Sequence, residues 1–117
     1  PRPRTQSMST ASDTSQPVHV DSPDEFLDLL DQHSRVLVDY YADWCGPCKM
    51  LAPTVEEIAE EADVTVLKVD IEAHQELASE AGVRSIPTIQ FLADGEEAER
   101  MVGVHDKSEM LDVVESL

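Results

Sequence analysis

The chain has 117 residues and a mass of 12.9 kDa, which favours one domain with a modest hydrophobic core. It carries 25 acidic and 8 basic side chains, so its formal net charge is −17 at pH 7. That charge argues against binding nucleic acid or an anionic membrane, because basic clusters bind phosphate groups. No apolar run is long enough to span a bilayer or to serve as a secretory signal.

The N-terminal segment is rich in Ser, Thr and Pro and has almost no large apolar side chains. Such a composition buries too little surface to fold, so residues 1–17 are expected to be a disordered tail. Met8 is a candidate natural start, and residues 1–7 would then be a cloning remnant; a functional tail is the alternative. The folded domain is expected over residues 18–117.

Strand and helix patterns alternate from there on. A short strand at 18–20 precedes a helix that Ser22 caps, with Pro23 in its first turn and its end near His33. Residues 35–41 are predicted to form a buried central strand, because their apolar side chains are contiguous rather than alternating. The apolar face of the first helix is expected to comprise Phe26, Leu27, Leu29 and Leu30.

A second, longer helix is predicted after the two cysteines, with Pro53 expected to kink it. Another buried strand is expected at 64–69, followed by a short helix at 73–81 with Gly82 just after its end. Helical spacing places five apolar side chains on one face of the longer helix: Leu51, Val55, Ile58, Ala59 and Ala62.

The C-terminal part differs because two strands follow each other directly. Residues 89–92 and 98–102 are predicted to pair as a hairpin across the Asp-Gly turn at 94–95. Asp106 and Glu109 have capping-box spacing at the start of the last helix. Its apolar face would comprise Met110, Val113, Val114 and Leu117. Alternation followed by a hairpin predicts an α/β fold with a central mixed sheet and helices on both faces.

Two cysteines, Cys45 and Cys48, enclose Gly46-Pro47 between the central strand and the longer helix. Residues i and i+3 at a helix start share a face, so the two sulfur atoms can form a disulfide. The helix N-terminus stabilises a thiolate at Cys45, whereas Cys48 is expected to be less accessible. Cys45 is therefore the predicted nucleophile and Cys48 the resolving thiol. Gly46 is expected to permit tight closure, and Pro47 lies where a missing N–H costs least.

Two other roles of such a cysteine pair, in a zinc site or in a structural disulfide, have less support from the sequence. A zinc site would need further ligands, but there is no second cysteine pair and the histidines lack ligand spacing: His19, His33, His74 and His105. An inert structural disulfide is disfavoured because so small a loop removes little chain entropy. Catalytic dithiol–disulfide exchange is the leading prediction, with no metal and no cofactor other than the reversible disulfide.

Residues 36–50 (VLVDYYADWCGPCKM) resemble the active-site segment of the thioredoxin family. The similarity extends over about residues 18–117 and is highly specific, because Cys-Gly-Pro-Cys occurs together with Trp44 and with Ile-Pro-Thr at 86–88. Further matching positions are Leu51-Ala52-Pro53, Lys68-Val69-Asp70, Val83-Arg84-Ser85, Gly95 and Gly103. The resemblance implies the thioredoxin fold and the activity of a protein-disulfide reductase.

The resemblance also implies roles for individual residues. Cys45 and Cys48 match the family's nucleophile and resolving thiol, and Pro87 matches a proline that follows a cis peptide bond beside the disulfide. Asp39 and Lys68 match an internal acid and its basic neighbour. The surface that receives the substrate would comprise Trp44, Gly46, Pro47, Ile86, Pro87 and Gly103. For Trp44, a place in the hydrophobic core is the alternative.

Asp39 interrupts the apolar run of the central strand. Burial should raise the pKa of its carboxyl group and a nearby Lys68 should lower it, and we expect burial to have the larger effect. A carboxylate there could accept the proton that Cys48 loses when it attacks a mixed disulfide. The alternative is a core acid without a chemical role.

The family likeness implies a monomeric cytoplasmic electron carrier that thioredoxin reductase reduces and that passes electrons to disulfide-containing target proteins. Relatives that oxidise or isomerise disulfides usually carry a histidine between the cysteines, so Gly46-Pro47 favours a reductase over these enzymes. A non-catalytic binding subunit with the same fold is the remaining alternative. Binding to nucleic acid or membranes is not expected.

The acidic excess has two explanations. Like charges gather on predicted helix faces, as at Glu56, Glu57, Glu60 and Glu61. The composition resembles that of proteins from salt-accumulating halophiles, which suggests a halophilic archaeon as the source. The alternative is a protein of ordinary cytoplasm that selects basic partners.

Overall fold

The computed structural model describes residues 15–117. Most of the tail expected at 1–17 lies outside the described residues, as do Met8 and residues 1–7. The strands are β1 (Val18–His19), β2 (Arg35–Tyr41), β3 (Thr65–Asp70), β4 (Thr88–Ala93) and β5 (Glu96–Val102). The helices are α2 (Pro23–Gln32), α3 (Gly46–Glu61), α4 (Gln75–Glu80) and α5 (Lys107–Ser116).

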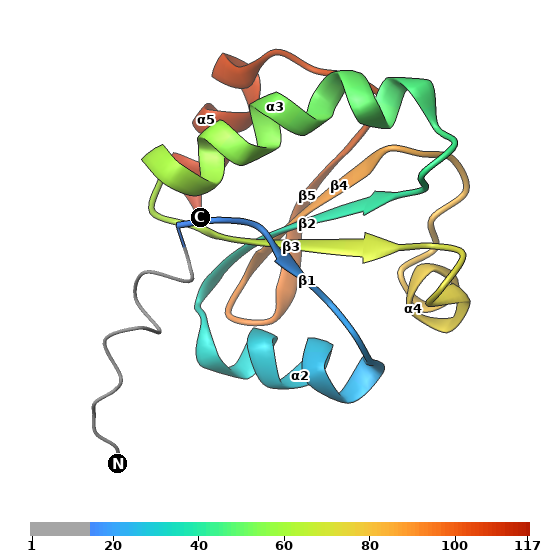
Figure 1. The fold of residues 1–117 in the computed structure, drawn as a ribbon. Helices are drawn as coiled ribbons and strands as arrows, with labels where there is room; N and C mark the ends of the chain where they lie inside the picture. Colours follow the sequence, from blue (N-terminus) through green and yellow to red (C-terminus); the bar gives the residue numbers. More distant parts are fainter. Residues whose placement is uncertain (1–14) are drawn as a thin grey trace.

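These strands form one mixed sheet in the order β1-β3-β2-β4-β5. β1, β3 and β2 run parallel, whereas β4 runs antiparallel to both β2 and β5. Figure 1 shows α3 and α5 on one face of the sheet and α2 on the other. The predicted α/β fold, with a central mixed sheet and helices on both faces, is confirmed.

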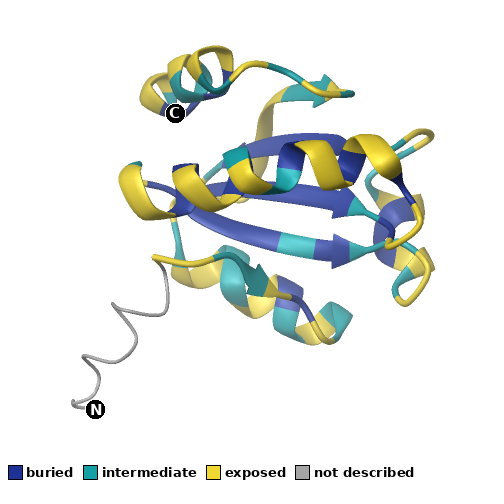
Figure 2. Cartoon of the chain, turned by 45° about the horizontal axis from the view of Figure 1, so that its top comes forward, coloured by how far each residue is buried: buried dark blue, intermediate teal, exposed yellow. Residues whose placement is uncertain are grey.

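Side chains of β2 alternate between two hydrophobic clusters. Leu37 joins the cluster beneath α3 and α5, whereas Val36, Val38 and Tyr40 join the cluster that α2 and α4 cover. The central strands are buried, and most of the exposed surface belongs to the helices and to β5 (Figure 2). A strand that is covered on both faces explains the contiguous apolar run in the sequence.

Helix starts follow the predicted caps. The Ser22 side chain accepts a hydrogen bond from the Glu25 amide, and Asp106 and Glu109 form a capping box at the start of α5. One predicted core residue is wrong: Leu27 is 59% exposed. At 100° per residue Leu27 lies outside the stripe formed by positions i, i+3 and i+4, which begins at Phe26.

Several boundaries differ slightly from the predicted ones. α4 is shorter than expected because the Asp70 carboxylate accepts hydrogen bonds from the amides of Glu72 and Ala73, which holds this segment in a turn. The hairpin strands are longer, and they meet at a turn in which Asp94 and Gly95 have φ angles of 51° and 84°. Within residues 15–117, no helix is long and apolar enough to cross a membrane.

Candidate active site

The N-terminus of α3 carries the two cysteines, in the connection that follows the carboxyl end of β2. Cys45 is the N-cap residue of α3, and its Sγ accepts a hydrogen bond from the Cys48 amide at 3.2 Å. A disulfide joins Cys45 to Cys48, whose Cα atoms are 5.3 Å apart. The sequence-based expectation of a disulfide across one helical turn is thus confirmed.

The expected difference in accessibility between the cysteines is wrong. The exposed fraction is 3% for Cys45 and 6% for Cys48, so both residues are buried in this oxidised state. Both belong to a small cluster with Ala42, against which Ile86 packs. The neighbouring segments therefore cover the outer cysteine as fully as the inner one.

Gly46 was expected to permit tight closure of the ring formed by residues 45–48, and the structure shows how much space surrounds this position. A Cβ atom added to Gly46 would meet no atom within 4 Å outside its immediate neighbours, and its φ angle is not in the left-handed region. Closure of the four-residue ring therefore places no steric demand on this position. Pro47 lies in the first turn of α3, where the missing N–H removes no helix hydrogen bond.

A second segment reaches the disulfide from the start of β4. The Ile86–Pro87 peptide bond is cis, as the family resemblance implies. Ile86 packs on the cysteine cluster, and the Pro87 carbonyl accepts a hydrogen bond from the Gly103 amide at 2.8 Å. Ile86 therefore brings the segment at 86–87 to the cysteines, and Gly103 is joined to this segment by a hydrogen bond.

Trp44 is 65% exposed, so its alternative place in the hydrophobic core is wrong. Its indole Nε1 donates a hydrogen bond to Oε2 of Glu72 at 2.7 Å, and Glu72 lies in the loop after β3. Sequence analysis did not identify Glu72, because the two residues lie 28 positions apart. The sequence analysis also did not predict that three further apolar side chains, close in sequence to these segments, are exposed: Met50, Val102 and Val104.

Asp39 is 2% exposed and lies on the same face of β2 as Leu37, the face that α3 covers. Burial raises the pKa of its carboxyl group and the Lys68 charge lowers it; burial has the larger effect, so the pKa rises from 3.8 to about 6. The expected order of the two effects is confirmed. Among the described residues, no group forms a hydrogen bond with its Oδ1 atom.

Lys68 lies on β3 directly opposite Asp39 in the strand register. Its Nζ atom stands 4.5 Å from the centroid of the Tyr41 ring, a cation–π contact that fixes the ammonium group. Lys68 and Cys48 line the same small surface cavity of about 130 Å³, together with Tyr41. Tyr41 was not singled out as a site residue from the sequence.

No three histidine, cysteine, aspartate or glutamate side chains come together as a metal-binding group within residues 15–117. The redox-active group that the site contains is the disulfide itself.

Comparisons with known proteins agree with this geometry. The family model described as Thioredoxin matches residues 17–116. A thioredoxin of Chlamydia muridarum is 46% identical over 98 residues, which cover 83% of this chain and 95% of the relative. A thioredoxin of Mycobacterium tuberculosis (strain H37Rv) is 42% identical over 114 residues, which cover 92% and 98%.

Solved structures show the same fold. A mutant thioredoxin from Halobacterium salinarum NRC-1 superposes with a TM-score of 0.85 at 45% identity. This match covers 88% of the present chain and 91% of the other. A thioredoxin from Schistosoma mansoni superposes with a TM-score of 0.81 at 30% identity, covering 89% of the present chain and 97% of the other.

Proposed function

The chain belongs to the thioredoxin family and is a thiol–disulfide oxidoreductase that reduces protein disulfides, and within this activity we propose distinct roles for its two cysteines. The reduced Cys45 thiolate attacks one sulfur of a target disulfide, forming a mixed disulfide and releasing the other target sulfur as a thiolate. The Cys48 thiolate then attacks Cys45 Sγ. The second target sulfur leaves as a thiolate, both target thiolates take up protons to give the dithiol, and Cys45 and Cys48 become the disulfide seen in the structure.

One observation carries this assignment. Cys45 is the N-cap residue of the 16-residue helix α3, and its Sγ already accepts the amide hydrogen of Cys48. An amide donor and the positive end of the helix dipole stabilise a thiolate at that sulfur, and a thiolate is the attacking species. Cys48 lies inside the first turn, so this stabilisation favours Cys45 as the nucleophile.

Reduction of insulin by dithiothreitol tests both the activity and the two roles. The wild-type chain should accelerate the reaction, and Cys45→Ser should abolish the acceleration. Cys48→Ser retains the attacking thiol and should accumulate stable mixed disulfides, detected as adducts on non-reducing gels. Lack of acceleration by the wild type would contradict the reductase assignment, and adducts formed by Cys45→Ser would reverse the roles of the cysteines.

We propose that the target's extended chain binds over the apolar surface at the disulfide. Its expected residues are Trp44, Gly46, Pro47, Ile86, Pro87 and Gly103. The exposure of Trp44 and the packing of Ile86 against the cysteine cluster support this proposal. Backbone groups of Ile86 would pair with the substrate as an added β-strand.

We also propose that Asp39, with Lys68 beside it, accepts the proton of Cys48. A carboxyl group whose pKa is about 6 can take up a proton and release it near neutral pH. Lys68, the strand partner of Asp39, lines the same cavity as Cys48, and this cavity is large enough to admit water.

The family suggests thioredoxin reductase as the electron donor and disulfide-containing proteins as targets. A dithiol must be kept reduced, so we place the protein in the cytoplasm. Its charge of −17 favours a monomer and disfavours contact with nucleic acid or membranes. We further propose a thioredoxin domain over 18–117 and a halophilic archaeal source, for which the acidic composition and the similarity to the Halobacterium protein are the support.

A further inference from the structure

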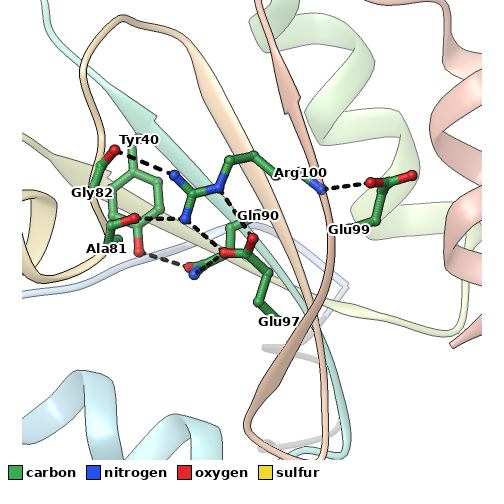
Figure 3. Close-up of polar contacts among 7 residues, drawn as sticks. All are labelled: Tyr40, Ala81, Gly82, Gln90, Glu97, Glu99 and Arg100. Atoms are coloured by element: carbon green, nitrogen blue, oxygen red, sulfur yellow. Dashed lines mark hydrogen bonds and ion pairs between the residues drawn. The ribbon is translucent and has the colours of Figure 1, made fainter.

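Arg100 in β5 reaches the C-terminal end of α4. Its Nη2 atom donates a hydrogen bond to the carbonyl oxygen of Ala81 at 2.5 Å, and Nη1 donates to that of Gly82 at 3.4 Å (Figure 3). Carbonyl groups at the end of a helix lack hydrogen-bond donors within the helix. Here the side chain of Arg100, from a distant strand, provides those donors. Arg100 thus ties β5 to the end of α4.

A series of hydrogen bonds holds Arg100 in this position. The Glu97 carboxylate accepts from Nη2 of Arg100 at 2.6 Å and from Nε at 3.3 Å. Gln90 in β4 donates to Glu97 at 2.9 Å, and the Tyr40 hydroxyl in β2 donates to Gln90 at 2.8 Å. Figure 3 shows this network crossing from β2 through β4 to β5 and on to the end of α4.

Each member of the network is in the protonation state that its bonds require. Burial raises the pKa of Tyr40 to about 12, so the hydroxyl remains a donor at neutral pH. The hydrogen bond from Arg100 lowers the pKa of Glu97, so the carboxylate remains an acceptor. Gln90 is buried and uses its amide oxygen toward Tyr40 and its amide nitrogen toward Glu97. Gln90 therefore connects the buried hydroxyl to the more exposed ion pair.

The end of α4 leads directly into the segment at the disulfide. Residues 83–87 follow Gly82 and contain the Ile86–Pro87 bond, and Ile86 packs on the cysteine cluster. The Val83 amide donates to the Ala78 carbonyl at 2.9 Å, so this segment begins on the last turn of α4. A shift of the helix end would therefore be passed to Ile86.

We propose that Arg100 is a positioning residue for disulfide exchange: by holding the carbonyl groups of Ala81 and Gly82, it fixes Ile86 and Pro87 for pairing with an extended protein substrate. This role rests on the proposed substrate surface. Arg100 acts through the backbone and takes no part in the sulfur chemistry. Protein substrates should therefore depend on it, whereas a small disulfide without a peptide backbone should not.

The test compares two substrates on three variants. Arg100→Met removes every donor, Arg100→Lys keeps the charge but cannot bridge both carbonyls and Glu97, and Lys107→Met is a control that removes one charge from α5. With insulin, KM should rise roughly tenfold for Arg100→Met and by less for Arg100→Lys. Both effects should be smaller than the roughly hundredfold loss of activity that a 1 Å misplacement of a substrate can cause. The reduction rate of dithiobisnitrobenzoate should stay within about twofold for all variants, and Lys107→Met should match the wild type with insulin.

Amide hydrogen exchange gives a readout that does not depend on substrate. Exchange at Val83 should become faster in both Arg100 variants, while exchange in β2 stays unchanged. The positioning role would be overturned if the Arg100 variants lost activity equally on insulin and on dithiobisnitrobenzoate. It would also be overturned if both the insulin kinetics and the exchange rate of the Val83 amide stayed unchanged. If Arg100→Met does not fold, the same comparison of substrates and of Val83 exchange is made with Arg100→Lys alone. A wild-type chain inactive on insulin would instead contradict the reductase assignment, and Val83 exchange would still decide whether Arg100 holds the segment.

Discussion

Asp39 stands between Val38 and Tyr40 in β2 and is almost fully buried, so its ionised form loses most of its hydration. The neighbouring Lys68 charge compensates only in part, which leaves the pKa near 6. Between about pH 4 and pH 6 the folded chain keeps a proton on Asp39 that the unfolded chain has released. The free energy of unfolding therefore falls as the pH rises through this window.

The variant Asp39→Asn should remove this pH dependence and be more stable than the wild type at pH 7. The shift of the Asp39 pKa from 3.8 to about 6 corresponds to about 2–3 kcal/mol in the free energy of unfolding. Above the folded pKa the wild type has lost all of this stability. Below about pH 4 the two proteins should differ little in this respect, because the wild-type carboxyl group is then neutral. Urea unfolding at pH 4, 5, 6 and 7 measures the difference.

Activity separates the two roles open to Asp39. A proton acceptor for Cys48 predicts slower turnover of insulin by Asp39→Asn, with the largest loss where release of the mixed disulfide limits the rate. A core acid without a chemical role predicts a stabilised and fully active variant between pH 6 and 9. Equal stability of variant and wild type at pH 7 would contradict the raised pKa itself.

Individual elements formed largely where local signals placed them, and the differences have local causes. The Asp70 side chain holds a turn that delays the start of α4, and the Asp94-Gly95 turn lets both hairpin strands extend. The end of β5 matters most for the site, because Gly103 follows it and donates its N–H to Pro87. Its φ angle of 89° lies in the left-handed region, which only glycine adopts readily.

Replacing this glycine tests that constraint. Gly103→Ala should lower the free energy of unfolding by about 1–2 kcal/mol, because an L-residue is strained at this φ angle even though a Cβ atom would meet no neighbour within 4 Å. Gly46→Ala is the matched control, because a Cβ atom at residue 46 also meets no neighbour within 4 Å but the φ angle there is not positive. Its free energy of unfolding should stay within about 0.5 kcal/mol of the wild-type value. Urea unfolding of both variants decides, and equal stabilities would show that residue 103 does not need glycine.

Across the whole molecule, 25 acidic side chains outnumber 8 basic ones. Lys107 forms ion pairs with Glu57 and Glu61 at 3.0 and 2.8 Å, whereas Glu56 and Glu60 add further negative charge to the exposed side of α3. Repulsion between like charges at i and i+4 weakens a helix, and a net charge of −17 destabilises the compact state. Salt screens such surface interactions.

The melting temperature should therefore be higher in 1 M salt, where the screening length is about 3 Å, than at about 0.05 M. The double variant Glu56→Gln/Glu60→Gln should melt higher than the wild type at low salt, and this difference should shrink in molar salt. Thermal unfolding followed by circular dichroism measures both effects. A wild-type melting temperature that is unchanged or lower in molar salt would count against adaptation to high salt.

Much of this protein was predictable from its sequence, because the signals involved act within a few residues. Helix caps, periodic apolar faces, the Asp-Gly turn and the spacing of Cys45 and Cys48 defined the elements, their order and the disulfide. The raised pKa of Asp39 followed from one charged residue in an apolar strand. Family resemblance added the cis bond before Pro87.

Only the tertiary structure decided which distant segments meet. Ile86 packs against the cysteine cluster, so Cys45 is as buried as Cys48. Trp44 is held by Glu72 from 28 residues away, and Arg100 donates to the carbonyl group of Ala81, the residue after α4, from 19 residues away. Such contacts depend on which strands pair in the sheet and on which face of the sheet each side chain occupies. No local pattern encodes them, because their partners become neighbours only when the sheet assembles.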